Sequence, residues 1–285
     1  MDSDTILDTT LIPWENGLQV LDKMTPKFRS NLGPREEIAD TFEKYWQKSL
    51  HQDESNTRRI DLVYLDEGYR DLTYAYHDSV EECYVLKGDL QMGGEGELRQ
   101  GDYFWRPPGF VHATQETTGF YAILGFQGVD KAEASGAVTR HIRPQVDRGI
   151  NFIYPDNLDL AVGPRGWIRR LPAGIIAWQR SPNIFTNIDF LDSDKSGLLE
   201  TKILSVNYTL SGATILLRLL PGYSVSITDE HASPWELFIL DGELNLDDYV
   251  CTAEHYIRLS RLDNITKISS ESGSIAYVKI DSMRT

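Results

Sequence analysis

The sequence repeats itself at an offset of 154 residues, without a gap over the best-matching stretch. In this register Gly68-Tyr69 faces Gly222-Tyr223, and residues 77–90 (HDSVEECYVLKGDL) face residues 231–244 (HASPWELFILDGEL). Identical positions are joined there by conservative exchanges between Tyr and Phe, Val and Ile, and Asp and Glu. Such a repeat predicts two copies of one structural unit, which limits the possible folds more than any single motif does.

Each copy has the pattern of antiparallel β-structure. After Arg59 the chain consists of short runs rich in Val, Ile, Leu, Tyr and Phe, separated by turns that contain Gly, Pro or Asp. A duplicated barrel explains the repeat, because each barrel closes its own sheet edges and buries its own core. A chain of 285 residues is long enough for two such cores. We therefore expect a first domain over residues 1–150, with an N-terminal arm, one helix and a first barrel, and a second barrel over residues 151–285.

The segment before the first barrel carries one helical pattern. Prolines interrupt the first thirty or so residues, which we expect to form an irregular arm. From Pro34, which suits a first helical turn, to residue 50, apolar side chains recur at helical spacing, namely Ile38, Phe42, Tyr45 and Trp46. This pattern predicts a single amphipathic helix that packs across a barrel or against the partner in a homodimer.

Composition and charge exclude several classes of partner. The chain has 28 basic and 43 acidic residues, a formal net charge of −15, which repels nucleic-acid phosphates and anionic membrane surfaces. We expect neither nucleic acid nor a membrane as a partner. The start of the chain shows no leader pattern and no apolar run approaches a membrane span, which predicts a cytoplasmic protein. Cys83 and Cys251 lie in apolar stretches and are expected to be buried free thiols.

Two motifs in the first copy resemble a known superfamily. Residues 101–112 (GDYFWRPPGFVH) place Gly, Pro, Gly and His at the spacing of the second signature motif of the cupins, and Glu81 with Gly88 resembles the first motif. The paired prolines and the adjacent Glu81 and Glu82 are most similar to the ChrR-like and acetylacetone-cleaving branch. The resemblance covers residues 60–126 well and 212–279 more weakly. It implies an all-β double cupin with two antiparallel jelly-roll β-barrels.

The resemblance also implies a metal site. In cupins the first motif supplies two histidines separated by one residue and a glutamate, and the second supplies a third histidine, which together hold one divalent metal. Carried over, the ligands are His77, Glu81 and His112, while Ala75 stands in the first-histidine position. Residues 75 and 77 alternate onto one face of a strand, and residue 81 can return to that face after a short turn.

Two imidazoles and one carboxylate suit Fe(II), with Mn, Ni and Zn as alternatives. The competing interpretation is that no metal binds and that His77, Glu81 and His112 remain from an ancestral site in a barrel now used for packing or binding. In the second copy His231 persists, but Asp229 takes the first-histidine position, Trp235 replaces the glutamate and Ile265 replaces the last histidine. The second barrel is therefore expected to be structural.

Two further residues are candidates for catalysis. Arg106 lies on the strand before the proline pair, where it would grip a carboxylate or enolate oxygen, or else form a surface ion pair. Glu116 would serve as an acid or base near the mouth of the barrel, or else lie solvated on a loop. Aromatic residues are expected in the core and the pocket wall, namely Tyr74, Tyr76, Phe104, Trp105, Phe120 and Tyr121.

The resemblance implies a metal-dependent enzyme with a small organic substrate, either aromatic or with a carbonyl or enol group. Dioxygenase-like chemistry is the most common activity on this scaffold, although the fold alone does not decide the reaction. A non-redox cyclase, isomerase or lyase with the same pocket is the second hypothesis. The third is a non-catalytic ligand-binding or regulatory cupin. Its anti-sigma-factor form is disfavoured, because those proteins carry a helical zinc domain with Cys and His ligands and this chain has two cysteines.

Overall fold

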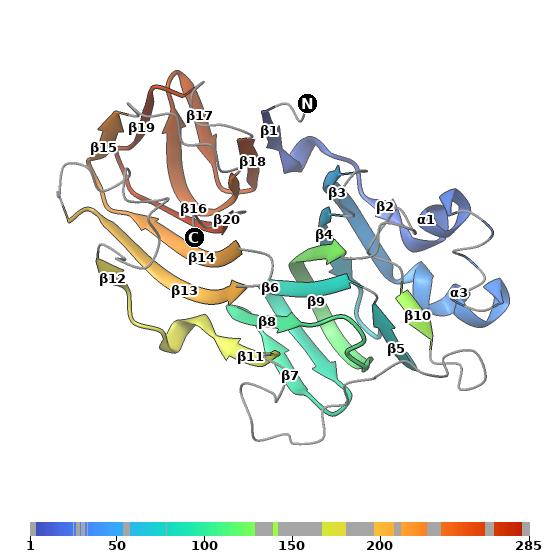
Figure 1. Ribbon diagram of the computed structural model, residues 1–285. Helices are drawn as coiled ribbons and strands as arrows, with labels where there is room; N and C mark the ends of the chain where they lie inside the picture. The colour runs from blue at the N-terminus through green and yellow to red at the C-terminus, as the bar shows by residue number, and fades with distance from the viewer. Residues whose placement is uncertain are drawn as a thin grey trace. The chain divides into compact units, whose positions relative to one another are not determined.

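The chain divides into two compact units. In the computed structural model these are Pro13–Gly174, here called the first barrel, and Met1–Ile12 with Ile175–Thr285, called the second barrel. The structure describes residues 4–24, 26, 29, 32, 34–53, 58–77, 79–128, 139–141, 167–180, 197–207, 212–226, 235–259 and 265–280. The expected domain boundary after residue 150 lies outside these described residues. Each unit contains a curved antiparallel sheet (Figure 1).

The first barrel is built on a sheet in the order β11-β8-β6-β9-β4-β3-β2, with β5 paired to β9 and β10, and β7 paired to β6. Its strands are β2 (Glu15–Asn16), β3 (Tyr45–Asp53), β4 (Arg58–Leu65), β5 (Asp71–His77), β6 (Ser79–Met92), β7 (Gly96–Arg99), β8 (Asp102–Arg106), β9 (His112–Gly128), β10 (Thr139–His141) and β11 (Ile168–Pro172). Its helices are α1 (Gly17–Lys23) and α3 (Arg35–Glu43).

The second barrel has the sheet order β1-β18-β16-β20-β14-β13-β12, with β17 and β19 paired to β16, and β15 paired to β19. Its strands are β1 (Thr5–Asp8), β12 (Gln179–Arg180), β13 (Leu199–Asn207), β14 (Gly212–Leu219), β15 (Tyr223–Ser226), β16 (Trp235–Leu246), β17 (Tyr249–Thr252), β18 (His255–Leu259), β19 (Lys267–Ser270) and β20 (Ser274–Ile280). Short 3₁₀ turns follow β1 and β11, at Thr9–Leu11 and Ala173–Ile175.

The ladder registers confirm the sequence repeat. The β3–β4 ladder of the first barrel shifts register between Ser49 and His51, and the β13–β14 ladder shifts between Ile203 and Ser205, each 154 residues later. The predicted register over residues 231–234 lies outside the described part of the chain. This irregularity of the sheet is therefore duplicated along with the sequence.

A close backbone approach explains one matched pair of glycines. Gly88 and Gly242 have φ values of 82° and 76°, which favour glycine. A Cβ atom would lie 1.9 Å from the carbonyl oxygen of Gly119 at the first position and 2.1 Å from that of Gly273 at the second. Each barrel therefore requires glycine there, and the requirement recurs at the repeat offset.

The predicted arm and helix differ from the structure in two ways. The helical pattern over residues 34–50 ends as a helix at Glu43, and Tyr45–Asp53 forms strand β3. The ladder with β4 satisfies the backbone of this segment, so tertiary pairing overrides a periodicity that fits both elements. The arm itself contains α1, whose start is fixed by a capping box between Asn16 and Gln19.

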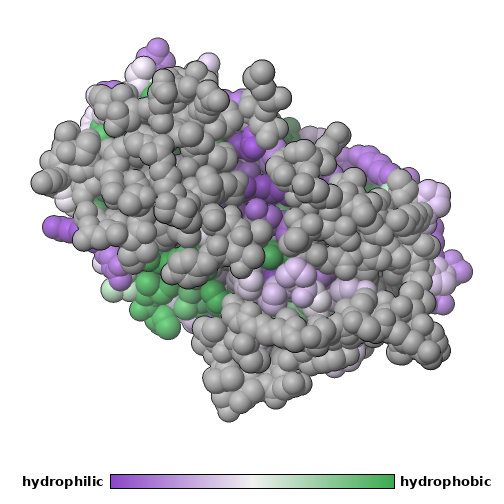
Figure 2. Space-filling view, in the orientation of Figure 1, coloured by the Kyte–Doolittle hydropathy of each residue, from purple (hydrophilic) through white to green (hydrophobic). Residues whose placement is uncertain are grey.

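The two cysteines and the surface can be compared with the sequence. Cys83 and Cys251 are buried free thiols, as predicted. No helix among the described residues combines the length and apolar character that a membrane crossing requires. The face drawn in Figure 2 carries both hydrophilic and hydrophobic side chains. Among the described residues, the exposed large hydrophobic side chains are Leu11, Tyr64, Tyr74, Ile175 and the adjacent Tyr249 and Val250 of β17.

Candidate metal centre

Three predicted ligands meet at one point of the first barrel. His77 at the end of β5, Glu81 near the start of β6 and His112 at the start of β9 each offer a ligand atom, and these atoms lie within 4.8 Å of one another. His77 and Glu81 are buried, and His112 is partly buried. We call these residues the His/Glu/His cluster.

Strand pairing brings the cluster together. The β5–β9 ladder sets Ala75 opposite His112, two residues before His77. The His77 ring stacks on that of His112, with centroids 5.1 Å apart, and meets the edge of Phe126 at 4.9 Å. Alternation along β5 therefore carries both Ala75 and His77 toward the cavity, as the sequence predicts.

The protonation states of the cluster suit a metal ligand set. Burial alone would raise the pKa of Glu81, but Arg106 and the two histidines outweigh it and lower this pKa to about 2. Burial lowers the pKa of His112 to about 3, although Glu81 opposes the shift. At neutral pH the cluster thus contains a carboxylate and a neutral imidazole, the forms that bind metal ions.

The orientation of the donors also fits a divalent ion. His112 Nδ1 lies 3.3 Å from the carbonyl oxygen of Phe110, which can only accept a hydrogen bond, so Nδ1 donates and the lone pair is on Nε2. His77 Nε2 and Glu81 Oε1 are 3.7 Å apart. That separation fits two ligand atoms at about 2.0–2.2 Å from one ion. The residues present therefore fit a metal with two nitrogen ligands and one carboxylate.

Arg106 points into the barrel, as expected for the first of the two roles predicted for it, and does not lie on the surface. It is 2% exposed, stacks on the Phe104 ring at 3.9 Å and donates from Nη1 to Glu81 Oε2 at 2.8 Å. Because Arg106 occupies Oε2, the other carboxylate oxygen of Glu81 is left toward His77. This arrangement orients a ligand rather than a substrate, and direct contact between Arg106 and substrate stays a prediction.

Glu95 completes this network and was missed from the sequence. It is 2% exposed and accepts two hydrogen bonds from Arg106, at 3.1 Å from Nε and 2.7 Å from Nη2. Burial raises its pKa to about 7 against the opposing charge of Arg106. The turn that holds Glu95 spans three residues between β6 and β7, whereas the matching turn between β16 and β17 spans two. The extra residue changes the repeat offset from 154 to 153 after this turn. That change was the signal in the sequence that could have drawn attention to Glu95.

Two other candidates lie apart from the cluster. Glu116 is exposed on β9 and is not among the described residues that line the cavity, because β9 shifts its pairing between Thr114 and Glu116. Its role as an acid or base stays a prediction.

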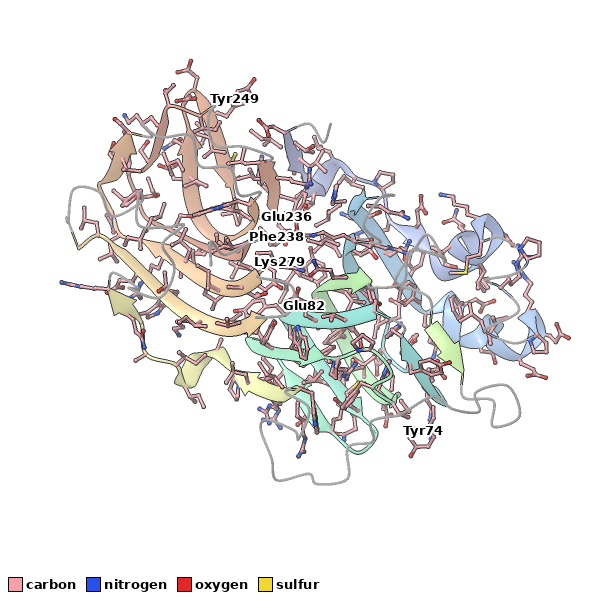
Figure 3. All side chains as sticks on the ribbon, in the orientation of Figure 1. Tyr74, Glu82, Glu236, Phe238, Tyr249 and Lys279 are labelled. Atoms are coloured by element: carbon pink, nitrogen blue, oxygen red, sulfur yellow. The ribbon has the colours of Figure 1, made fainter. Side chains whose placement is uncertain are left out.

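Tyr74 is 55% exposed and extends away from the sheet in Figure 3, so its assignment to core or pocket wall is wrong. Alternation along β5 places it opposite to Ala75.

The His/Glu/His cluster lines a cavity of about 660 Å³. Phe104, Phe120 and Phe126 form part of an apolar wall, which confirms two of the predicted aromatics. Phe42 of α3 and Val20 of α1 also line the cavity, so the N-terminal helices contribute to the site. The volume falls within the range of sites for small organic ligands.

The second barrel has apolar residues at the matching positions. Glu81 and Arg106 are cross-strand partners in the first barrel, and Trp235 and Leu259 are partners in the second. Both replacements belong to one hydrophobic core, and Ile265 packs against it as the residue expected in place of the last histidine. His231 and Asp229 lie outside the described residues.

Comparisons with known proteins show the fold. No protein-family model matches the sequence. No curated protein matches it either. A candidate dioxygenase from Nostoc punctiforme is 17% identical with a TM-score of 0.68, covering 99% of this chain and 83% of that chain. A Bacillus subtilis oxalate decarboxylase mutant is 13% identical with a TM-score of 0.51, covering 84% and 73%. Protein YlbA from E. coli is 14% identical with a TM-score of 0.51, covering 98% and 91%. These likenesses show that the chain has the fold of a double cupin.

Proposed function

We propose that the chain is a metal-dependent enzyme that binds a small organic substrate in the first barrel, with dioxygenase-like chemistry on an aromatic, carbonyl or enol group. The observation that carries the proposal is the His/Glu/His cluster on the wall of a cavity of about 660 Å³. The fold shared with a candidate dioxygenase and an oxalate decarboxylase is compatible with it.

Different residues would bind the metal, orient its carboxylate ligand and shape the substrate pocket. His77, Glu81 and His112 would hold the ion, most suitably Fe(II), which would supply Lewis acidity toward a carbonyl or enolate oxygen and access to dioxygen chemistry. Arg106 keeps Glu81 ionised and aimed. Ala75 leaves space beside His112 for a substrate oxygen, and the phenylalanine walls exclude water from the reacting atoms.

Metal analysis and oxygen uptake test the proposal together. Protein without a histidine tag, loaded with Fe(II) under argon and desalted, is expected to retain about one equivalent of iron per chain. Addition of air with a β-diketone or a catechol should then give substrate-dependent oxygen consumption. Wild-type protein that retains no divalent metal would overturn the assignment.

The alternatives are separated by the same measurements. A protein that binds metal and converts substrate without oxygen uptake would be a non-redox cyclase, isomerase or lyase. A protein that binds the compound without converting it would be a ligand-binding cupin. Homodimerisation and a cytoplasmic location stay predictions, and the first is tested by sedimentation of the purified chain.

A further inference from the structure

The cavity has a second group of polar residues, on strands β3 and β4. Arg59 and Asp61 form an ion pair with 2.5 Å between Nε and Oδ2. Arg59 Nη2 donates to Gln47 Oε1 at 2.8 Å, and Tyr45 Oη donates to the same oxygen at 3.3 Å. All four residues line the cavity. We call them the β3–β4 polar cluster.

One oxygen of this cluster lacks a hydrogen-bond partner. The Asp61 side chain is 1% exposed, and among the described residues nothing donates a hydrogen bond to its Oδ1. Burial raises the pKa of Asp61 to about 6, opposed by Arg59 and by a hydrogen bond from Ser49, so the ionised form predominates at neutral pH. A buried carboxylate oxygen without a donor is costly unless a ligand supplies one.

The second barrel shows that the scaffold does not require this cluster. At the repeat offset, Arg59 and Asp61 correspond to Ala213 and Ile215, which belong to the hydrophobic core of the second barrel. The flanking ladder registers are the same in both copies. Because apolar residues fill these positions in the same fold, the ion pair of the first barrel is not explained by folding of the barrel.

The ladders also give the position of the cluster relative to the candidate metal centre. Arg59 pairs with Phe126 across β4 and β9, and Phe126 pairs with Glu81 across β9 and β6. Neighbouring strands are about 4.8 Å apart, so about 10 Å separate the backbones of Arg59 and Glu81. Side chains on the concave face of a curved sheet converge. The functional groups of Arg59 and Glu81 are therefore closer together than their backbones. Phe126 and Leu124 form an apolar floor between the two sites.

We propose that the β3–β4 polar cluster is a recognition subsite for an uncharged hydroxyl group, at the end of the substrate opposite to the oxygen that binds at the His/Glu/His cluster. The inference rests on the proposed function. A hydroxyl supplies the donor that Asp61 Oδ1 lacks, and the paired charge of Arg59 leaves no net charge to attract a carboxylate or an ammonium group. The apolar floor fits an aromatic body, so the substrate class is a hydroxyaryl ketone or enol.

Two matched compounds and one variant test the subsite. The probes are 1-(4-hydroxyphenyl)butane-1,3-dione and 1-phenylbutane-1,3-dione, which differ only in the hydroxyl. Titration calorimetry under argon on Fe(II)-loaded protein measures both dissociation constants. We expect the wild-type protein to bind the hydroxyl compound about tenfold more tightly. The variant Arg59→Ala/Asp61→Ile, which copies the second barrel, should bind both compounds equally, with an unchanged iron content and an unchanged affinity for the compound without the hydroxyl.

Each failure has its own signature. Equal affinities in the wild-type protein, or a tenfold preference that survives in the variant, would overturn the subsite and leave the metal site intact. Absence of iron from the wild-type protein, or no binding of either dione, would overturn the proposed function and the subsite with it. If the variant is insoluble, Arg59→Met/Asp61→Leu keeps most of the volume of Arg59 and the branched shape of Asp61, and it is expected to give the same loss of preference.

Discussion

Where the first barrel pairs Glu81 with Arg106 across two strands, the second barrel pairs Trp235 with Leu259 in the equivalent register. The same contrast holds two strands away from Glu81, on β4, where Asp61 in the first barrel corresponds to Ile215 in the second. In the first barrel these buried charges surround a cavity, and at the matching positions the second barrel has apolar core residues. The second barrel has its own buried ion pair, between Glu236 and Arg258, at other positions.

The difference teaches that the charges of the first barrel are not a condition of the fold. Replacing buried ion pairs by well-packed apolar residues is often neutral or stabilising, whereas removing one partner costs about 3–5 kcal/mol. The first barrel keeps two groups of buried charges, namely Arg106 with Glu81 and Glu95, and Arg59 with Asp61. Under the proposed function, both groups are retained for what the cavity binds. The second barrel serves as an internal reference for each of the following tests.

The largest expected effect is loss of the metal from the first barrel. His112→Ala removes one of three ligands, and we expect the bound iron to fall from about one equivalent to none, measured by elemental analysis after desalting. His255→Ala in the second barrel is the matched control and should leave the iron content unchanged. Unchanged iron in the His112 variant would show that the ion, if bound, lies elsewhere.

Removal of Glu95 is expected to have the next largest effect. Glu95→Ala takes a carboxylate away from the buried Arg106, which should lower the free energy of unfolding by about 3–5 kcal/mol in urea titrations. Because Arg106 then loses one of its two anchors, metal affinity should fall about 10–100-fold. Asp248→Ala, in the shorter and exposed turn of the second barrel, should change stability by less than about 0.5 kcal/mol. If Glu95→Ala and Asp248→Ala lowered the free energy of unfolding equally, the two turns would not differ in their contribution to stability.

The pH dependence of stability should distinguish the charged interior from the apolar one. The folded pKa of Asp61, about 6, lies above its unfolded value, so the protonated group favours the folded state. This contribution is complete below about pH 4 and is lost as the pH rises through 6, by about 3 kcal/mol. Arg59→Ala/Asp61→Ile should flatten the dependence of unfolding free energy between pH 4 and 7. The variant should retain a smaller dependence of the same sign, because the pKa of Glu95 is also raised. Parallel curves for the two proteins would refute the shift.

The smallest expected effect concerns the position next to His112. Ala75 is 4% exposed and lines the cavity, so Ala75→His would restore a fourth ligand beside the ion. We expect tighter metal binding and lower turnover, because the imidazole occupies the place proposed for a substrate oxygen. Ala75→Leu controls for volume and should cost about 1–3 kcal/mol without a gain in metal affinity. A destabilised Ala75→His protein with unchanged metal affinity would favour an ancestral site without function.

Much of the site could be predicted from the sequence because its information is local. Alternation along β5 brings residues 75 and 77 to one face, and His77, Glu81 and His112 follow from motif spacing and meet as expected. Gly88 and Gly242 recur because both copies require the same close backbone approach. The duplicated register follows from the repeat itself.

Other features depended on pairing between strands that a local sequence pattern cannot identify. Thr5–Asp8 pairs with β18 in the second barrel, nearly 250 residues away, and Ile168–Pro172 pairs with β8 in the first, so each barrel takes an edge strand from the segment leading into the other. Residues 45–50 fit a helix by periodicity and become a strand because β4 offers them a ladder. A helical or alternating pattern records which face is apolar, and it does not record which neighbour will cover that face.

The sequence by itself therefore determined the duplication, the barrel class and three candidate ligands, since these depend on spacings of a few residues and on one long repeat. The tertiary structure alone decided that Arg106 would be held between Glu81 and Glu95, and that Arg59 and Asp61 would face the same cavity two strands from Glu81. The physical reason is the ladder register. Hydrogen bonding between strands distant in the chain sets which charged side chains share a low-dielectric interior, and only there does pairing between them become strong.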